Sequence, residues 1–136
     1  MIDSRKKVRL LVVDSEPDYQ RHLREIIDLC SHQYEIVAEF ASSGGGAARQ
    51  LLHRFEPSVV LFDVHAADRE GVELLRGCSD LEVPVIATAE SRNHEVEEQA
   101  LRNGAIAFIT RSEDPDDIES ILHTAAHVAG DLQPRH

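Results

Sequence analysis

The sequence predicts an α/β domain in which helices cover both faces of a five-stranded parallel sheet. Two observations lead to this prediction. Short apolar runs alternate with segments of helical periodicity five times along the chain, which is typical of a parallel sheet with covering helices. The runs contain few polar positions, as expected of strands that are buried on both faces.

The five strands are expected at short, largely apolar runs that end at polar or turn residues. The first run stops at Asp14, the third stops at Asp63, the fourth leads into Thr88 and the fifth leads into Arg111. In chain order, the predicted strands cover residues 8–13, 35–41, 59–62, 83–87 and 106–109.

The five helices are expected where apolar residues recur at a spacing of three or four. Ser15 and Pro17 suit the cap and first turn of the first helix, and Pro57 ends the second. Gly104 suits the end of the fourth helix, and Pro115 opens the fifth. In chain order, the predicted helices cover residues 16–31, 47–55, 71–76, 93–103 and 115–129.

With short connections between them, these elements fit a doubly wound, flavodoxin-like fold with strand order 2-1-3-4-5 and five helices. The length of 136 residues fits one domain of ordinary size. We expect residues 1–7 to lead into this domain, residues 8–130 to form it, and residues 131–136 to be a tail.

Polar side chains are expected to meet at one edge of this sheet. With this strand order, ligands bind at the carboxyl ends of the first and third strands, where Asp14 and Asp63 stand. Thr88 and Arg111 end the neighbouring strands. Two close carboxylates repel each other unless a divalent cation or a raised pKa relieves the repulsion. The set suits phosphoryl transfer to Asp63, with Mg²⁺ and a cationic side chain neutralising the phosphoryl oxygens.

At these positions the chain resembles the receiver domain of two-component response regulators, from Val8 to about Gly130. Four stretches carry the resemblance: Leu-Val-Val-Asp-Ser-Glu-Pro at 11–17, Glu-Pro-Ser-Val-Val-Leu-Phe-Asp at 56–63, Val-Pro-Val-Ile-Ala-Thr-Ala at 83–89, and Gly-Ala-Ile-Ala-Phe-Ile-Thr-Arg at 104–111. The second strand and the loop after it resemble the NarL/FixJ branch of the family most closely.

The resemblance implies a phosphorelay function. Asp63 is expected to accept phosphate from a histidine kinase or phosphotransfer protein. Asp14, Asp63 and the backbone carbonyl of His65 are expected to bind Mg²⁺, and Thr88 and Phe108 to act as switch residues. The face made by the fourth helix, fifth strand and fifth helix is expected to bind a partner or form a homodimer.

Four departures from the family pattern fall at this edge. Ser15 stands where the family has a second metal-binding acid, and a hydroxyl is a poorer Mg²⁺ ligand than a carboxylate. Arg111 stands where the family has lysine, and the two cations are not interchangeable. Ala67 and Ser112 each replace a proline. These departures leave open a second hypothesis, in which the receiver is degenerate and acts as an interaction module without phosphorylation.

Composition argues against other function classes. The net charge of −11 disfavours direct binding to nucleic acid. No apolar run is long enough for a membrane span or a signal peptide, so we expect a cytoplasmic protein without membrane partners. Cys30 and Cys78 match no zinc pattern and are expected to be reduced thiols.

We do not expect an enzyme. A flavodoxin would need a phosphate-binding loop rich in glycine and hydroxyl residues after the first strand, where Asp14 to Pro17 stand instead. A phosphatase of the haloacid dehalogenase type would need Asp-x-Asp, and His65 occupies the position of the second acid. Fold alone does not decide function, so this expectation depends on these residues.

Overall fold

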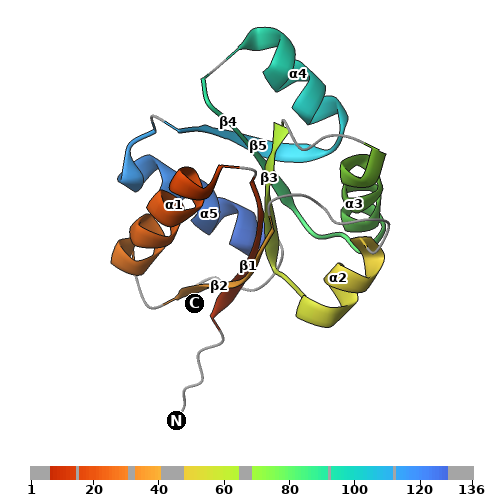
Figure 1. Cartoon of the computed structure of the whole chain (residues 1–136), viewed down its shortest axis with the longest axis horizontal. Coiled ribbons are helices and arrows are strands. Elements are labelled where there is room, and N and C mark those ends of the chain that lie inside the picture. Colours follow the sequence, from red (N-terminus) through yellow and green to blue (C-terminus); the bar gives the residue numbers. More distant parts are fainter. Residues whose placement is uncertain are drawn as a thin grey trace.

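The computed structural model describes residues 7–14, 16–30, 33–40, 48–64, 69–91, 93–111 and 113–128 (Figure 1). The strands are β1 (Val8–Val13), β2 (Tyr34–Phe40), β3 (Val59–Asp63), β4 (Val85–Ala89) and β5 (Ala105–Thr110). The helices are α1 (Pro17–Cys30), α2 (Ala48–Phe55), α3 (Arg69–Asp80), α4 (His94–Arg102) and α5 (Pro115–Val128).

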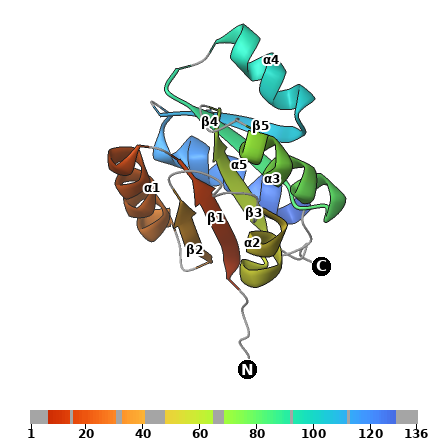
Figure 2. The same cartoon turned by 45° about the vertical axis from the view of Figure 1, so that its right-hand side comes forward.

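The five strands form one parallel sheet in the order β2-β1-β3-β4-β5. Helices α1 and α5 lie on one side of this sheet, and α2 and α3 lie on the other (Figures 1 and 2). The predicted doubly wound fold with five strands and five helices is therefore confirmed. Within the described ranges, no helix is long and apolar enough to cross a membrane.

Two predicted elements differ from the structure by two residues or more at an end, and the others differ by at most one. Helix α3 covers Arg69–Asp80 instead of residues 71–76, because Leu74 and Cys78 lie four residues apart and both pack in the core. Strand β4 begins at Val85 instead of residue 83. The backbone N–H of Val83 donates to the carbonyl of Cys78 at 2.8 Å, so Val83 belongs to the turn that follows α3.

Two hydrophobic clusters, one on each face, hold the sheet between its helices. In β1, Leu10 and Val12 join the cluster under α1 and α5, whereas Leu11 and Val13 join the cluster under α2 and α3. This alternation follows from the two-residue period of a strand and explains why the strands are apolar at nearly every position.

One irregularity in β5 changes this alternation. Ala105 pairs with Val85, but the next pair is Ala107 with Ile86, so Ile106 is an extra residue in the ladder. As a result, Ala105 and Phe108 both join the cluster on the α3 side. The side chain of Ile106 is exposed.

Candidate functional site

Two carboxylates lie side by side at the carboxyl edge of the sheet. The register pairs Val13 of β1 with Phe62 of β3, so the residues that follow them, Asp14 and Asp63, are neighbours. Asp14 is 1% exposed and Asp63 is fully buried. Two acids without contact with water require nearby positive charge or hydrogen-bond donors, which makes this edge the candidate site.

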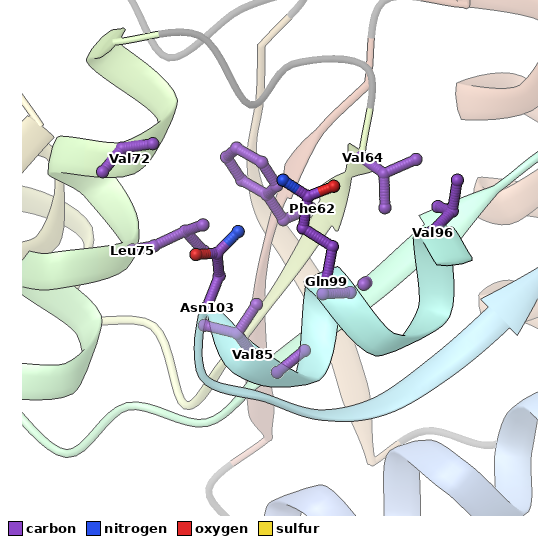
Figure 3. A pocket seen from close by; sticks show the side chains of 11 residues that line it. Phe62, Val64, Val72, Leu75, Val85, Val96, Gln99 and Asn103 are labelled. Carbon is purple, nitrogen blue, oxygen red and sulfur yellow. The ribbon is translucent and has the colours of Figure 1, made fainter. Parts of the chain in front are cut away.

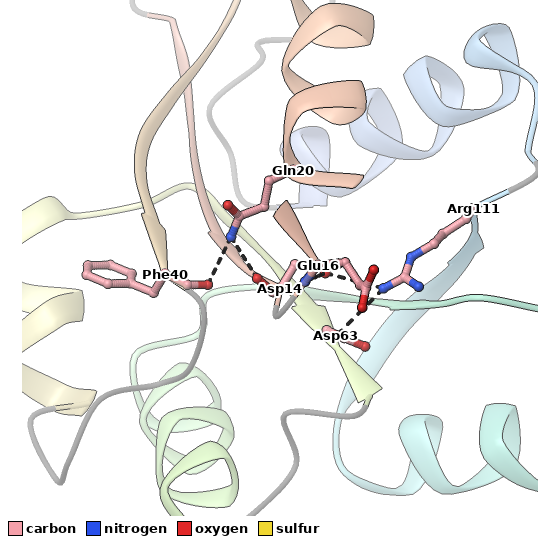
Figure 4. A network of polar contacts seen from close by, with 6 residues as sticks. All are labelled: Asp14, Glu16, Gln20, Phe40, Asp63 and Arg111. Carbon is pink, nitrogen blue, oxygen red and sulfur yellow. Dashed lines mark hydrogen bonds and ion pairs between the residues drawn. The ribbon is translucent and has the colours of Figure 1, made fainter. Parts of the chain in front are cut away.

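Asp14 is held from two directions (Figure 4). Its backbone N–H donates to the carbonyl of Phe40 at 2.9 Å, and the Glu16 N–H donates to its Oδ1 at 2.8 Å. The side-chain amide of Gln20 on α1 donates to the carbonyl oxygens of Asp14 and Phe40, at 2.7 and 3.2 Å. Gln20 thus ties the ends of β1 and β2 to the first helix and fixes where the Asp14 carboxylate lies.

Arg111 supplies the positive charge. Its Nη2 lies 3.3 Å from Oδ1 of Asp14 and 3.7 Å from Oδ2 of Asp63, as the dashed lines in Figure 4 indicate. Its backbone N–H donates to the carbonyl of Ala89 at 3.0 Å, which anchors it just beyond β5. The side chain is only 19% exposed. The structure therefore places Arg111 between the two acids and not, as a simple surface cation would lie, in solvent.

Tyr19 is a member of the site that the sequence did not indicate. Its spacing on α1 marks it as a core residue, and it is indeed buried. Its ring also lies beneath the guanidinium of Arg111, with Cζ 4.9 Å from the ring centroid. A cation over the face of an aromatic ring is attracted to it. Nothing in the helical pattern distinguishes such a tyrosine from an ordinary core residue.

Burial dominates the electrostatics of the site. It raises the pKa of the Asp14 carboxyl above its usual value; the Glu16 N–H opposes the rise, the Asp63 charge adds to it, and Arg111 opposes it. Burial, together with the charge of Asp14, raises the pKa of Tyr19 to about 12. The tyrosine ring is therefore neutral at physiological pH, and its attraction for Arg111 does not depend on an ionised hydroxyl.

Thr88 and Phe108 lie near the acids but differ in what they contact. Thr88 is the register partner of Asp63 and is buried. Within the part of the chain that the structure describes, its Oγ1 has no hydrogen-bond partner. Phe108 is buried in the cluster that contains Phe62 and Ala87. The resemblance implies a switch role for Phe108, and in this structure its side chain lies inside the protein.

Two predicted site residues, Ser15 and His65, lie outside the described residues, as do Ala67 and Ser112. Among the described residues, no group of three His, Cys, Asp or Glu side chains is arranged to hold a metal ion. The buried Oδ2 of Asp14 nevertheless has no hydrogen-bond partner in those same residues. An unpaired buried carboxylate oxygen fits a divalent cation, so the acids present are compatible with Mg²⁺.

A separate cavity of about 380 Å³ lies between α3 and α4 (Figure 3). Its walls are mainly apolar, and the side-chain amides of Gln99 and Asn103 are its polar groups. The remaining lining residues are Phe62, Val64, Val72, Leu75, Val85, Ala87, Val96, Ala100 and Ala105. The sequence did not indicate this cavity.

Known proteins with similar sequences are response regulators and related proteins. Residues 10–123 match the family model described as "Response regulator receiver domain". The chain is 32% identical over 117 residues to the transcriptional regulatory protein KdpE of Mycobacterium tuberculosis, covering 85% of this chain and 50% of that protein. It is 33% identical over 109 residues to a protein-glutamate methylesterase/protein-glutamine glutaminase of Yersinia pseudotuberculosis, covering 77% of this chain and 30% of that protein.

Solved structures agree in fold. The signal receiver domain of the response regulator NarL from Mycobacterium tuberculosis superposes with a TM-score of 0.73 at 24% identity, covering 88% of this chain and 97% of that one. At this identity the likeness supports the fold alone, so membership of the NarL/FixJ branch stays a prediction. The family match and the KdpE similarity, added to the sheet order and the acid pair, show that the chain belongs to the response-regulator receiver domain family.

Proposed function

We propose that this receiver domain accepts a phosphoryl group on Asp63 from a histidine kinase or phosphotransfer protein. One observation carries the proposal: Asp63 is a buried carboxylate at the carboxyl end of β3, with Asp14, Thr88 and Arg111 converging on it from three other segments. These are the groups that phosphoryl transfer requires around a nucleophile.

In the transfer step, a carboxylate oxygen of Asp63 attacks phosphorus, and the bond between phosphorus and the donor atom breaks with its electron pair leaving on the donor. Arg111, within 3.7 Å of Asp63, neutralises charge on the phosphoryl oxygens. Thr88 then donates its hydroxyl proton to one of them. When bound, Mg²⁺ held by Asp14, Asp63 and the backbone carbonyl of His65 supplies further charge neutralisation.

The phosphoryl group is proposed to shift an equilibrium between two conformations of the domain. Thr88 and Phe108 are the switch residues in this proposal, because Thr88 is the register partner of Asp63 and Phe108 is the register partner of Ala87, the residue before Thr88. The output surface comprises α4, β5 and α5, where Leu101 and Ile106 are exposed apolar residues. A partner protein or a second copy of the chain would bind this surface.

We further propose that residues 8–130 form the working domain and that the protein acts in the cytoplasm by binding other proteins. In this proposal it catalyses no reaction of its own and does not bind nucleic acid or membranes directly. Receiver domains of regulators are generally not enzymes. The chain spans half the length of KdpE and less of the methylesterase, so activities of those whole proteins are not transferred to it.

The test is phosphorylation with acetyl phosphate and Mg²⁺, followed by intact-mass analysis. We expect one phosphoryl adduct on the wild-type chain and none on Asp63→Asn. Asp116→Asn is the matched control, because it makes the same substitution at an exposed acid on α5 and should leave the adduct in place. An adduct that persists in Asp63→Asn would contradict the proposal.

A second candidate function is an interaction module that does not need phosphate. The observation that favours it is the position of Arg111, whose guanidinium already pairs with both acids. Under this alternative, the folded wild-type chain acquires no adduct from acetyl phosphate and shows no change with beryllofluoride. Either result with a folded protein would replace the phosphorylation proposal.

A further inference from the structure

The Arg111 side chain makes three contacts, two through the same nitrogen and one through the flat face of the guanidinium. Its Nη2 reaches Asp14 at 3.3 Å and Asp63 at 3.7 Å, and its flat face lies over the ring of Tyr19 at 4.9 Å. Tyr19 itself is buried between α1 and the sheet, so its ring is a rigid support. The geometry leaves the guanidinium directed at the carboxylates.

Charge explains why such a support matters. Asp14 and Asp63 are two carboxyl groups in a site that is closed to water, and burial, with the Asp63 charge adding to it, raises the pKa of Asp14. When both carboxyls are ionised, one guanidinium halves their net charge. A planar guanidinium stacks on an aromatic face better than an ammonium does, so the Arg111 and Tyr19 pair is chemically specific.

We propose that Tyr19 is a positioning residue that seats the Arg111 guanidinium on the acid pair, so that the resting site carries its own counter-cation. Divalent cations then compete with this guanidinium for the same two carboxylates. The proposal deepens the phosphorylation proposal and rests on it for its biological use, because the seated guanidinium sets how much Mg²⁺ the site needs before transfer. Its physical content can be tested without any phosphodonor.

The test measures Mg²⁺ affinity by isothermal titration calorimetry on the whole 136-residue chain. Tyr19→Leu removes the ring face, and Tyr19→Phe keeps it and removes only the hydroxyl. From the usual strength of a cation over an aromatic ring, we expect Tyr19→Leu to bind Mg²⁺ roughly 2- to 30-fold more tightly than wild type. Tyr19→Phe should bind Mg²⁺ as wild type does.

A double-mutant cycle separates positioning from a general structural effect. In an Arg111→Ala background, Tyr19→Leu should no longer change Mg²⁺ affinity, because no guanidinium remains to be seated. Tyr34→Leu is the matched control: it removes another buried tyrosine ring, at the opposite end of the sheet where β2 begins, and should not change Mg²⁺ affinity. An equal effect of Tyr19→Leu in both backgrounds would overturn the proposal.

Nuclear magnetic resonance gives a second readout that needs no metal. Protons of Arg111 that lie over the Tyr19 ring should be shifted upfield, and this shift should persist in Tyr19→Phe. If Tyr19→Leu does not fold, the Tyr19→Phe spectrum and the Arg111→Ala titration still decide. A normal Arg111 shift in wild type, or weaker Mg²⁺ binding by folded Arg111→Ala, overturns the proposal. If these results hold but the chain is not phosphorylated by acetyl phosphate, only the proposed function is rejected.

Discussion

Helices α5 and α4, which cover opposite faces of the sheet, are packed differently. On one face, α5 places Ile118, Leu122, Ala125 and Ala126 in the core, each at most 1% exposed. On the other face, Ala100 is the one residue of α4 that is buried, and the cavity of about 380 Å³ lies beside it. This cavity is partly open to solvent, so α4 does not seal against the sheet at this point. The comparison indicates that α5 is held by packing, whereas α4 is held much less by it.

The sequence of each helix explains the difference. The core positions of α5 recur at helical spacing and are all apolar. Helix α4 carries three glutamates, and its apolar Leu101 is 49% exposed. A helix with few buried contacts opens at low free energy cost. We therefore expect α4 to change conformation more readily than α5.

Side-chain truncation should show the largest contrast between the two faces. Leu122→Ala removes a fully buried side chain and should lower the free energy of unfolding by about 2–5 kcal/mol. Val96→Ala on α4 should cost about 1 kcal/mol or less, because Val96 is only partly buried beside the cavity. Urea unfolding followed by circular dichroism measures both, since the chain contains no tryptophan. Equal losses of unfolding free energy in the two variants would contradict the difference in packing between α5 and α4.

Added volume should separate the faces with one matched substitution. Ala126→Val on α5 forces two carbons into a filled core and should lower the free energy of unfolding by about 1–3 kcal/mol. Ala100→Val on α4 projects into the cavity and should cost only its helix propensity, roughly 0.5 kcal/mol. The same unfolding experiment applies. A larger loss for Ala100→Val would mean that the cavity cannot accept the added carbons.

Removing a helix cap should change stability the least of these substitutions. It should also show most clearly which helix is affected. Asn93 accepts hydrogen bonds from the N–H groups of Glu95 and Val96 at 2.9 and 3.2 Å, and Asp114 accepts from Asp116 at 2.9 Å. Each alanine substitution should cost about 1 kcal/mol. For Asn93→Ala, we expect faster amide exchange in α4 with little change in global unfolding.

Asp114→Ala is the control for this capping experiment, because it removes the equivalent cap from the packed helix α5. It should lower the free energy of global unfolding, since α5 unfolds together with the core. If Asn93→Ala reduced global stability as much as Asp114→Ala, then α4 would be part of the same cooperative unit. The distinction between the two faces would then not extend to their dynamics.

The fold was predictable because it depends on patterns that the sequence displays directly. Apolar runs that end at Asp14 and Asp63 fixed the strand ends, and the strand order then placed both acids at one edge. Two bounds were wrong for local reasons: Cys78 extends the core face of α3, and the Val83 N–H is used by a turn. The residues brought together at the site were predictable to the extent that they end strands.

Other features of the site depend on three-dimensional contacts that no periodicity encodes. The stacking of Arg111 on Tyr19 joins a residue just beyond β5 to a residue of α1, far apart in the chain, and each has an ordinary explanation by itself. The cavity beside α4 depends on how closely a helix approaches the sheet, which side-chain spacing does not determine. The role of Asp63 is a prediction that the acetyl phosphate experiment tests, and the roles of Thr88 and Phe108 remain predictions.

The extra residue in β5 affects both the exposed and the buried side chains of this strand. Because Ile106 has no partner in the ladder with β4, it is left exposed, and the residues after it change sides. Phe108 thereby faces α3 and α4 instead of α1 and α5. Pairing Ile106 with Ile86 would turn Phe108 toward α1 and α5, whereas deleting Ile106 would leave Phe108 opposite Ala87 on the α3 side. The unpaired position therefore lets β5 carry one additional exposed apolar side chain while Phe108 keeps its buried place.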